Sequence, residues 1–465
     1  MSRVVVILFM CVLAASMPLR AQDLGCGSAV GLDGADVTVG AVSGDDTENI
    51  QCALTAAARD GYRNVFLSDA EYDVGGIEVT GFVGDLAGRS TSKTKITVTD
   101  GALACGASTP GAVLRFNVGN VAVRKIAFDI SSACAEPGSV NVIAFYSDPS
   151  DCSKRTGNGN VDRIAISGAG TSSDDYVTGV VMDAAPECDP VNEKILGTLK
   201  VNRSTLSGID FGVITSLGGG AQVDINYNEI ASVGLPISII DAGQSTTILG
   251  NDITYNDVAS YDVGTGLGTT AILIGSTENA PADNGTTIKN NKFNDAGSTS
   301  EGYAVLSAQF DKSVNHGMVM TGNTFTGDSD NSGGAGIAVL DTANGLVSGN
   351  TFKSYAPTWL YLSSGDSADG AAAVTVDGWA IVGNIFSAST ADTDIGLGDG
   401  TRSNVVGRSQ NQPVVTDLSG DNDVLESSAS ASFFIGGDVR VGAQRQHEKQ
   451  INFLSGRRGG RQLAN

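Results

Sequence analysis

The sequence MVMTGNTF at Met318–Phe325 returns as GLVSGNTF at Gly345–Phe352. In both stretches an apolar side chain stands three places before an Asn, and a Phe stands two places after it. A similar pattern recurs around six asparagines: Asn228, Asn251, Asn291, Asn323, Asn350 and Asn384. Successive asparagines lie 23, 40, 32, 27 and 34 residues apart, which is too irregular for a coiled coil or a helical repeat of fixed period.

Each unit carries short apolar runs separated by turns rich in Gly, Asn, Asp and Ser, a pattern typical of short β-strands. Such a unit cannot bury its own apolar residues, so we expect the units to stack as coils about 4.8 Å apart. The Asn tolerates a tight turn and can hydrogen-bond the Asn of the next coil in a ladder. The alternative is that Asn is only a frequent turn residue, but the flanking apolar positions move with it. The residues three places before each Asn, or before Ser204 in the first coil, should point inward: Val201, Ile225, Ile248, Ile288, Met320, Val347 and Ile381.

The composition agrees with a β-solenoid. Among 465 residues there are 61 Gly, while aromatic residues make up 6% and charged residues 17%. These values suit many short strands and tight turns, and they argue against long amphipathic helices. A repeat array is one continuous body, so this length does not require several domains.

The N-terminus has the pattern of a secretory signal over residues 1–21. Arg3 supplies the positive start, Val4–Met17 the apolar run, and Ala21 the cleavage point. We therefore expect a secreted, periplasmic or cell-surface protein, and no later segment is apolar enough to span a bilayer. Removing the signal takes away two arginines and no acid, so the formal charge moves from −23 to 26 minus 51, or −25. This charge argues against nucleic acid as a partner, and an acidic polysaccharide would need a local basic groove or a bridging cation.

Six cysteines remain after the signal, and an even number in an exported chain favours disulfides over a metal site. Six allow 15 connectivities. Sequential pairing is our preferred prediction because each bond would fasten a terminus or a long loop: Cys26–Cys52, Cys105–Cys134 and Cys152–Cys188.

A single helix is expected between Asp46 and Gly61. Asp46 is a suitable N-cap, and Gly61 is placed to end the helix. The apolar residues between them share one helical face: Ile50, Ala53, Leu54, Ala57 and Ala58. A helix laid over the first coil would protect the open end of a solenoid from strand addition.

This N-terminal region resembles the signature of the pectate-lyase-like superfamily of right-handed parallel β-helix proteins. The resemblance rests on GDDT at Gly44–Thr47, Ile50-Gln51, the Ala-rich helix, VFL at Val65–Leu67 and Glu71-Tyr72. The chain departs from the usual Leu-Pro-x-Gly-x-Tyr, because Leu67–Tyr72 reads LSDAEY. The resemblance implies an all-β fold, a right-handed parallel β-helix with an N-terminal capping α-helix. The superfamily includes polysaccharide lyases, polygalacturonase-type hydrolases and phage tailspike depolymerases, so the fold alone does not fix the chemistry.

We accordingly divide the chain into a signal peptide (1–21), a cap and first coil (22–80), the β-helix (81–406), and C-terminal strands with a basic tail (407–465). The tail from Arg440 is rich in Lys and Arg, which suits either a docking tail for an acidic partner or a solvated end.

Residues four and two places before the Asn should point outward, and they place Lys200, Asp224 and Lys289 on one polar face with Asn202 and Asn226. The resemblance implies a role for them. In β-helix lyases an exposed Lys or Arg takes the proton beside a uronate carboxyl group, and carboxylates bind the cation that neutralises it. The alternative is a surface ion pair between Lys200 and Asp224 contributing under ~1 kcal/mol.

A hydrolase would need two carboxyl groups about 5 to 9.5 Å apart. Asp183, Asp241 and Asp341 end strand-like runs, and Asp183 and Asp241 would be about 9.6 Å apart if Thr215 lay in the intervening coil. The full motifs of polygalacturonase-type hydrolases are absent, and His316 is more consistent with a loop residue.

Two loops are rich in Asp, residues 328–333 and 392–399, so calcium is the candidate cofactor, although neither completes an EF-hand. Trp359, Tyr361, Tyr303 and Tyr227 could offer faces for sugar stacking, whereas Trp379 aligns with inward positions.

Together these features predict a secreted carbohydrate-active protein, either a polysaccharide lyase or a glycoside hydrolase acting on extracellular or envelope polysaccharide. The alternative is a non-catalytic cell-surface or adhesion module that binds glycans through a stiff β-helix.

Overall fold

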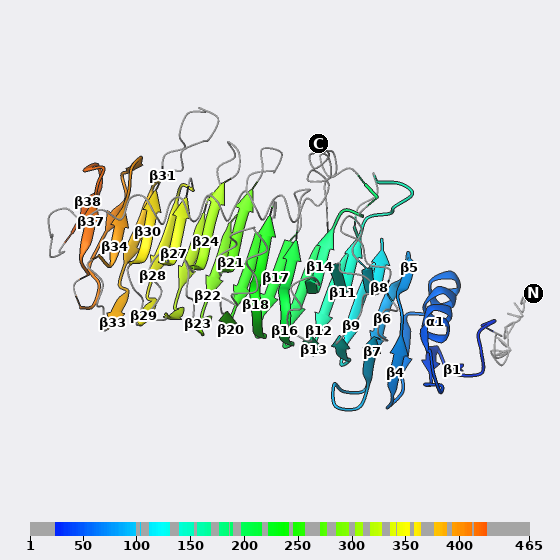
Figure 1. Cartoon of the computed structure of the whole chain (residues 1–465). Coiled ribbons are helices and arrows are strands. Elements are labelled where there is room, and N and C mark those ends of the chain that lie inside the picture. Colours follow the sequence, from blue (N-terminus) through cyan, green and yellow to red (C-terminus); the bar gives the residue numbers. More distant parts are fainter. Residues whose placement is uncertain are drawn as a thin grey trace, which may run out of the picture.

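The computed structural model is a right-handed parallel β-helix whose coils stack along one axis, with a helix at its N-terminal end (Figure 1). This confirms the fold predicted from the sequence. The structure describes residues 24–98, 103, 111–130, 139–152, 156–168, 176–185, 187–188, 197–215, 222–240, 245–255, 270–276, 285–296, 303–309, 317–327, 335–340, 342–353, 358–363, 376–387, 393–411 and 413–425.

The first face of the β-helix is a sheet of 15 strands, called sheet A here. Its strands are parallel except for the β1–β2 hairpin at the N-terminal end. In spatial order they are β1 (Val30–Asp33), β2 (Asp36–Val39), β3 (Asn64–Leu67), β6 (Val83–Ala87), β9 (Asn120–Arg124), β12 (Asn158–Asp162), β15 (Thr198–Asn202), β17 (Gln222–Asn226), β19 (Ser245–Leu249), β22 (Thr286–Lys289), β25 (Met318–Thr321), β28 (Gly345–Ser348), β32 (Trp379–Val382), β36 (Val405–Val406) and β38 (Asp423–Val424).

The other two faces form one sheet of 21 strands, called sheet B, because two long strands, β16 (Thr205–Thr215) and β18 (Glu229–Ile240), bend and pair on both faces. The face that follows sheet A in each coil also contains β4 (Glu71–Val74), β7 (Lys95–Val98), β10 (Ala127–Ile130), β13 (Ala165–Gly168), β20 (Asp252–Tyr255), β23 (Lys292–Asp295), β26 (Thr324–Thr326), β29 (Thr351–Lys353) and β33 (Ile385–Ser387). The last face also contains β5 (Ile77–Thr80), β8 (Gly111–Asn117), β11 (Ser139–Tyr146), β14 (Tyr176–Asp183), β21 (Thr270–Ser276), β24 (Tyr303–Gln309), β27 (Ala335–Leu340), β30 (Thr358–Ser363), β34 (Ile395–Leu397) and β37 (Val415–Asp417). Two short strands, β31 (Val376–Asp377) and β35 (Thr401–Arg402), pair separately.

The inward residues of sheet A stack in register, as predicted from their distance to the Asn. Each of the following is fully buried and lies opposite the next: Val201, Ile225, Ile248, Ile288, Met320, Val347 and Ile381. Since a parallel strand pairs residue for residue, one repeated apolar position gives a continuous column in the core.

The asparagine ladder is also present, running from Asn228 to Asn384. In Asn323, for example, Oδ1 accepts hydrogen bonds from the backbone N–H and the Nδ2 of Asn291, at 2.9 and 3.1 Å. Its own Nδ2 donates to Ile288 O and to Asn350 Oδ1, both at 2.9 Å. All four hydrogen-bonding positions of the buried amide are used, so the ladder joins successive coils without leaving a buried polar atom unpaired.

A column of aromatic rings lies in the next face of the C-terminal coils. Phe293, Phe325, Phe352 and Phe386 stack with centroids 4.8, 4.8 and 5.1 Å apart and planes within 11° of parallel. These spacings match the distance between strands, so each ring lies on the one below.

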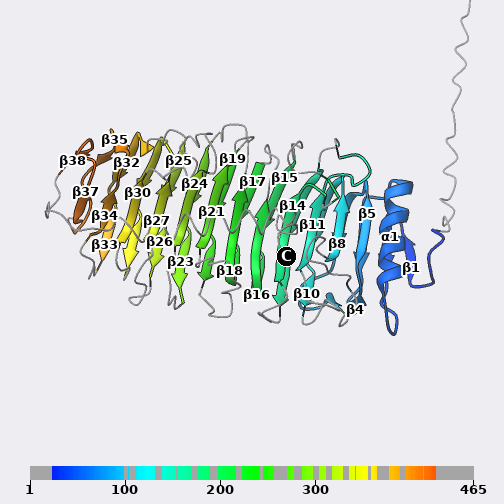
Figure 2. The same cartoon turned by 45° about the horizontal axis from the view of Figure 1, so that its top comes forward.

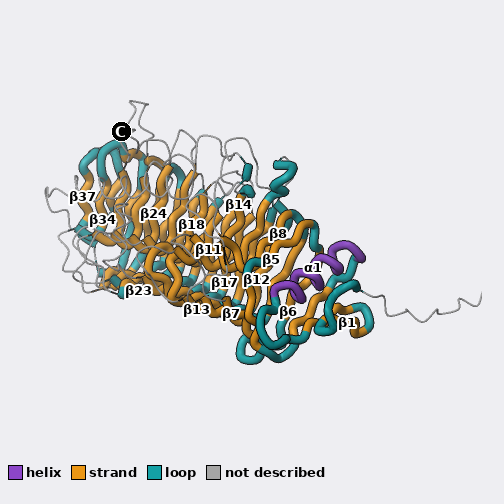
Figure 3. Tube along the Cα trace, turned by 45° about the vertical axis from the view of Figure 1, so that its right-hand side comes forward, coloured by secondary structure: helices purple, strands orange, loops and turns teal. Residues whose placement is uncertain are grey.

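The helix α1 (Thr47–Asp60) covers the N-terminal end of the core, and Figure 3 shows it beside the first coils. Its buried face contains Ile50, Ala53, Leu54, Ala56 and Ala57, while Ala58 is only partly buried. Gly61 ends the helix in the left-handed conformation at φ 79°. Asp46 stands at the N-cap, but its carboxylate does not cap the helix. It accepts hydrogen bonds from Val42 N and Asp73 N and so joins the helix start to β4.

Two of the three predicted disulfides are confirmed, Cys26–Cys52 and Cys152–Cys188. The first fastens the segment before β1 to the capping helix. Cys105 and Cys134 lie outside the described residues, as do the predicted signal and the basic tail. Within the described part of the chain, no helix has the length and apolar character needed to cross a membrane.

Candidate functional site

The outward face of sheet A carries one row of side chains across six successive strands, from β3 to β17, and five of its six members are polar. Its members lie opposite one another in register, and we call them the central row: Asn64, Asp85, Ala122, Asn160, Lys200 and Asp224. The order follows from strand alternation; Lys200, for example, lies between the buried Leu199 and Val201.

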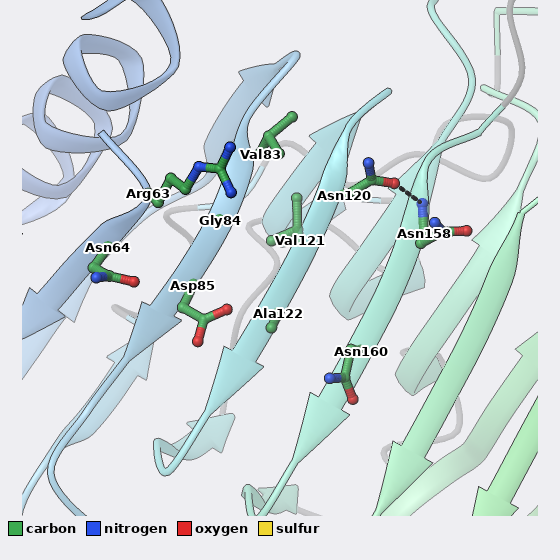
Figure 4. Close-up of a pocket in the computed structure, with 10 residues that line it drawn as sticks. All are labelled: Arg63, Asn64, Val83, Gly84, Asp85, Asn120, Val121, Ala122, Asn158 and Asn160. Carbon is green, nitrogen blue, oxygen red and sulfur yellow. Dashed lines mark hydrogen bonds between the residues drawn. The ribbon is translucent and has the colours of Figure 1, made fainter. Parts of the chain in front are cut away.

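A shallow cavity of about 340 Å³ lies over the first four strands of this row (Figure 4). Its lining residues come from β3, β6, β9 and β12 and the residue before β3: Arg63, Asn64, Val83, Gly84, Asp85, Asn120, Val121, Ala122, Asn158 and Asn160. Gly84 is required here, because a Cβ at that position would lie 2.0 Å from Arg63 O. The close approach lets the Arg63 side chain reach over β6 at one end of the cavity.

The cavity is lined by amides with hydrogen-bonding capacity to spare. Asn120 Oδ1 accepts from Asn158 N at 3.2 Å, and Asn158 Oδ1 accepts from Thr198 N at 2.8 Å. Neither contact uses the Nδ2 donors. Among the described residues, the side chains of Asn160 and Arg63 make no hydrogen bond or ion pair. The arrangement therefore offers both donors and acceptors to a polar ligand.

Ion pairs fix the charged side chains around the row. Arg124 lies 3.4 Å from Asp85, and Lys200 Nζ lies 3.5 Å from Asp224 Oδ2. Beside the row, the buried Asp162 on β12 lies within 2.9 Å of two arginines, Arg163 and Arg203.

The structure brings together two of the three predicted site residues. Lys200 and Asp224 are neighbours in the central row, and Asn160 joins them to the cavity. Lys289 lies opposite Leu249 in the adjacent row with Asn202 and Asn226, three strands beyond Lys200. That separation is about 14 Å along the axis. Lys289 and Lys200 therefore cannot contact the same sugar ring.

Of the three carboxylates considered for hydrolysis, Asp183 lies within the described residues, at the end of β14. Thr215 lies in β16, between β14 and β18, so it occupies the intervening coil as considered from the sequence. Its direct neighbours are Met182 and Ile239 rather than Asp183. Asp241, Asp341 and His316 lie outside the described residues.

Three of the four aromatic residues considered for sugar stacking are buried. Trp359 and Tyr303 are fully buried and Tyr361 is 3% exposed, because β24 and β30 are covered on both sides and strand alternation no longer marks an outward face. Tyr227 differs, with 60% of its surface exposed. Trp379 points inward as predicted, and its indole N–H donates to Thr342 O at 2.7 Å.

No group of three or more His, Cys, Asp or Glu side chains that could hold a metal ion occurs among the described residues. The loop 328–333 lies outside them, and Asp394 in the second Asp-rich loop accepts a hydrogen bond from Val414 N. Calcium binding stays a prediction.

Sequence reasoning missed the cavity itself, although a signal for it exists. The alternation that located Lys200 continues toward the N-terminus through Asn158–Asp162, Asn120–Arg124 and Val83–Ala87. Those coils have no ladder Asn, so an alignment anchored on Asn stops at Ser204.

No protein-family model and no curated protein sequence matches this chain. It is similar in structure to the A-module of the mannuronan C-5 epimerase AlgE6 of Azotobacter vinelandii, at 14% identity and TM-score 0.43 over 83% of this chain and 96% of that one. It is also similar to tailspike protein 3 of bacteriophage CBA120, at 12% identity and TM-score 0.45 over 84% and 60%. A mannuronic acid specific polysaccharide family 6 lyase from human gut microbiota gives 16% identity and TM-score 0.40 over 83% and 87%. These identities are too low to transfer a substrate or a reaction.

Proposed function

We propose that this chain is an exported carbohydrate-active protein that binds an extended polysaccharide along the outer face of sheet A. The observation that carries the proposal is the continuity of the central row with the amide-lined cavity. Polar groups recur at the strand spacing of about 4.8 Å, which is close to the length of one sugar unit in an extended chain. A linear glycan lying along the axis would meet an equivalent set of groups at each ring.

The chemistry of the cavity suits sugar hydroxyl groups. Hydroxyls both donate and accept, and side-chain amides such as those of Asn120, Asn158 and Asn160 do the same. The formal charge of −23 opposes a nucleic acid on the same face. The open, shallow shape suits a polymer that extends beyond the site on either side.

For the chemical step, the arrangement favours a lyase over a hydrolase. Asp85 and Asp224, the two carboxylates of the central row, are four strand steps apart, or about 19 Å, far more than the 5 to 9.5 Å that hydrolysis requires. We propose Lys200 as the proton-abstracting group at the end of the cavity, with Asp224 holding it in place. Binding without turnover is the second candidate function, favoured by the ion pair that engages Lys200.

Incubation of the purified mature protein with acidic and neutral polysaccharides tests the proposal. Ultraviolet absorbance of an unsaturated product reports lyase chemistry, a reducing-end assay reports hydrolysis, and parallel runs with calcium and with chelator test the predicted cation. Asn160→Ala should weaken binding and Lys200→Ala should abolish turnover. Lys289→Ala, outside the row, should retain both activities.

Binding without turnover would establish the binding module. Equal activity of the Asn160→Ala and Lys289→Ala proteins would place the ligand elsewhere and contradict the proposal.

A further inference from the structure

The turn between sheet A and sheet B has the same backbone conformation in many coils, and one of its residues is left-handed. In four successive coils this residue is a long side chain, and we call these residues the edge stripe: Lys125, Arg163, Arg203 and Tyr227, with φ values of 56°, 54°, 50° and 58°. In later coils the same position is Asn290 in one coil, with φ 55°, and otherwise glycine at Gly250, Gly322, Gly349 and Gly383.

The turn itself does not need these side chains. A residue with a Cβ is strained in the left-handed region, whereas glycine is not. The glycine-containing coils show that the turn closes without a side chain. Strained positions that carry three cations and an aromatic ring therefore indicate a role for the side chains outside the turn.

Two members of the edge stripe form a fixed guanidinium pair. The Asp162 carboxylate accepts from Arg163 Nε at 2.9 Å and from Arg203 Nε at 2.8 Å, with the Arg203 terminal nitrogen at 2.6 Å. The Asp162 side chain is 6% exposed, but the arginine side chains are 47% and 58% exposed. Each guanidinium carries five N–H groups, so several remain to face solvent from an anchored position.

Tyr227 occupies the next coil of the edge stripe. Its ring lies against Gly250, where an added Cβ would come within 2.7 Å of two ring carbons. Glycine at 250 thus lets the ring lie down on the following turn. With 60% of the residue exposed, the ring offers an open surface one strand spacing beyond Arg203.

We propose that the edge stripe recognises the anionic groups of an acidic polysaccharide that runs along the β-helix axis. The Arg163–Arg203 pair binds one carboxylate or sulfate in the paired geometry that guanidinium groups favour, and Tyr227 stacks on the adjacent ring. Lys125, which makes no ion pair among the described residues, meets the next anionic group on the other side. The inference rests on the proposed function and adds the charge of its substrate. It also supplies the local basic surface that a chain of net charge −23 needs for such a ligand.

A role limited to neutralising Asp162 is the structural alternative. It accounts for the contacts of both arginines with the two carboxylate oxygens, but it explains neither the exposure of the guanidinium groups nor the exposed Tyr227 in the same turn position.

The test compares binding of three probes to the full mature chain: polygalacturonate, dextran sulfate and dextran. The variant Arg163→Gln/Arg203→Gln removes the guanidinium pair, and Lys292→Gln/Lys353→Gln makes the same charge change on sheet B. We expect about tenfold weaker binding of the acidic probes by the first variant and less than about twofold change by the second, with dextran binding unchanged. Loss of polygalacturonate binding alone assigns the pair to carboxylates, and loss of both acidic probes assigns it to oxyanions in general.

Two further variants separate binding from folding. Asp162→Asn added to the arginine variant avoids leaving a buried carboxylate unpaired. Tyr227→Gly suits the left-handed backbone, so it should leave the melting temperature unchanged while weakening the binding of the acidic probes.

Equal losses in the arginine and lysine variants would overturn the inference. So would dextran binding that depends on Asn160 without binding of either acidic probe, and that result would leave the proposed function standing. Failure of all three probes to bind would contradict both this inference and the proposed function.

Discussion

The coils from β3 to β17 and those from β19 to β36 share one backbone path but differ at the same turn. In the C-terminal coils a glycine or Asn290 precedes a buried Asn of the ladder. In the N-terminal coils Lys125 and Arg163 precede buried isoleucines, Ile126 and Ile164, and at the boundary Tyr227 precedes Asn228, the first Asn of the ladder. The C-terminal coils keep their polar groups inside as a ladder, and the coils of Lys125 and Arg163 present theirs to solvent.

The outward face of sheet A changes in the same direction. The central row is polar from Asn64 to Asp224 except at Ala122, and its continuation reads Thr247, Thr287, Val319, Leu346, Ala380 and Val405. The coils that repeat most faithfully therefore provide internal order, and the coils that depart from the repeat carry the candidate ligand surface. In a solenoid, irregularity of the sequence locates chemistry better than regularity does.

The largest effect should come from breaking the aromatic column. Phe325→Ala removes a fully buried ring between Phe293 and Phe352, and we expect a loss of about 4 kcal/mol in the free energy of unfolding. Chemical denaturation measures it. Phe66→Ala, an N-terminal ring that is 38% exposed, should lose less than about 1 kcal/mol. Similar losses in the free energy of unfolding at the two sites would show that packing in the C-terminal core contributes no more than the exposed N-terminal ring.

Breaking the ladder should cost slightly less. Asn323→Ala leaves Ile288 O and the backbone N–H and Nδ2 of Asn291 without their partners, and we expect a loss of about 3 kcal/mol. Thermal denaturation of this variant is compared with that of Asn294→Ala, which removes an exposed Asn of β23 outside the ladder. A melting temperature equal to that of the control would mean that water or the backbone replaces the ladder.

A third effect, of about 1 kcal/mol, isolates the left-handed turn. Gly349→Ala meets nothing within 4 Å of the added Cβ, so its cost is the backbone conformation alone. Lys125→Gly should raise the free energy of unfolding by a similar amount or leave it unchanged, while weakening the binding of the acidic probes. Destabilisation by Lys125→Gly would show that the lysine supports the fold, and the contrast between the two sets of coils would then lose its functional meaning.

Much of this organisation was predictable from the sequence because it repeats. The Asn ladder, the inward column through Ile288 and the helix before Gly61 each follow from local periodicity and turn chemistry. Asp46 was placed correctly at the helix start, but its contacts with Val42 and Asp73 depend on how the chain folds back, which no local pattern records.

The candidate site was harder to predict for two physical reasons. Burial of sheet B strands on both sides hid Trp359 and Tyr361, which period-two alternation alone would leave exposed. The cavity lies in coils without the ladder Asn, where the anchor used for alignment is missing.

The smallest effect concerns the outward ion pairs of the N-terminal coils. On sheet B, Lys95 Nζ lies 2.8 Å from Asp129 and 3.2 Å from Glu71. The hydrogen bond that Lys95 donates to Asp129 raises the pKa of Lys95, and hydrogen bonds donated by Thr97 and then Lys95 lower the pKa of Glu71. A lysine whose pKa is raised on folding stabilises the fold at pH values below its unfolded pKa. This contribution is lost as the pH rises through the folded pKa. A glutamate whose pKa is lowered on folding stabilises the fold at pH values above its unfolded pKa. This contribution is lost as the pH falls through the folded pKa.

The network should therefore contribute between about pH 5 and pH 10 and fade on both sides. Because these side chains are well exposed, Lys95→Met should lose under ~1 kcal/mol at neutral pH, and the loss should shrink in concentrated salt and above about pH 11. Urea midpoints at several pH values measure this, with Lys353→Met, on a C-terminal coil, as the control. A loss that persists at high pH and high salt would mean that the aliphatic stem of Lys95 packs against the sheet. The N-terminal coils would then depend on side-chain packing as the C-terminal coils do, and their outward charges would be free to serve a ligand.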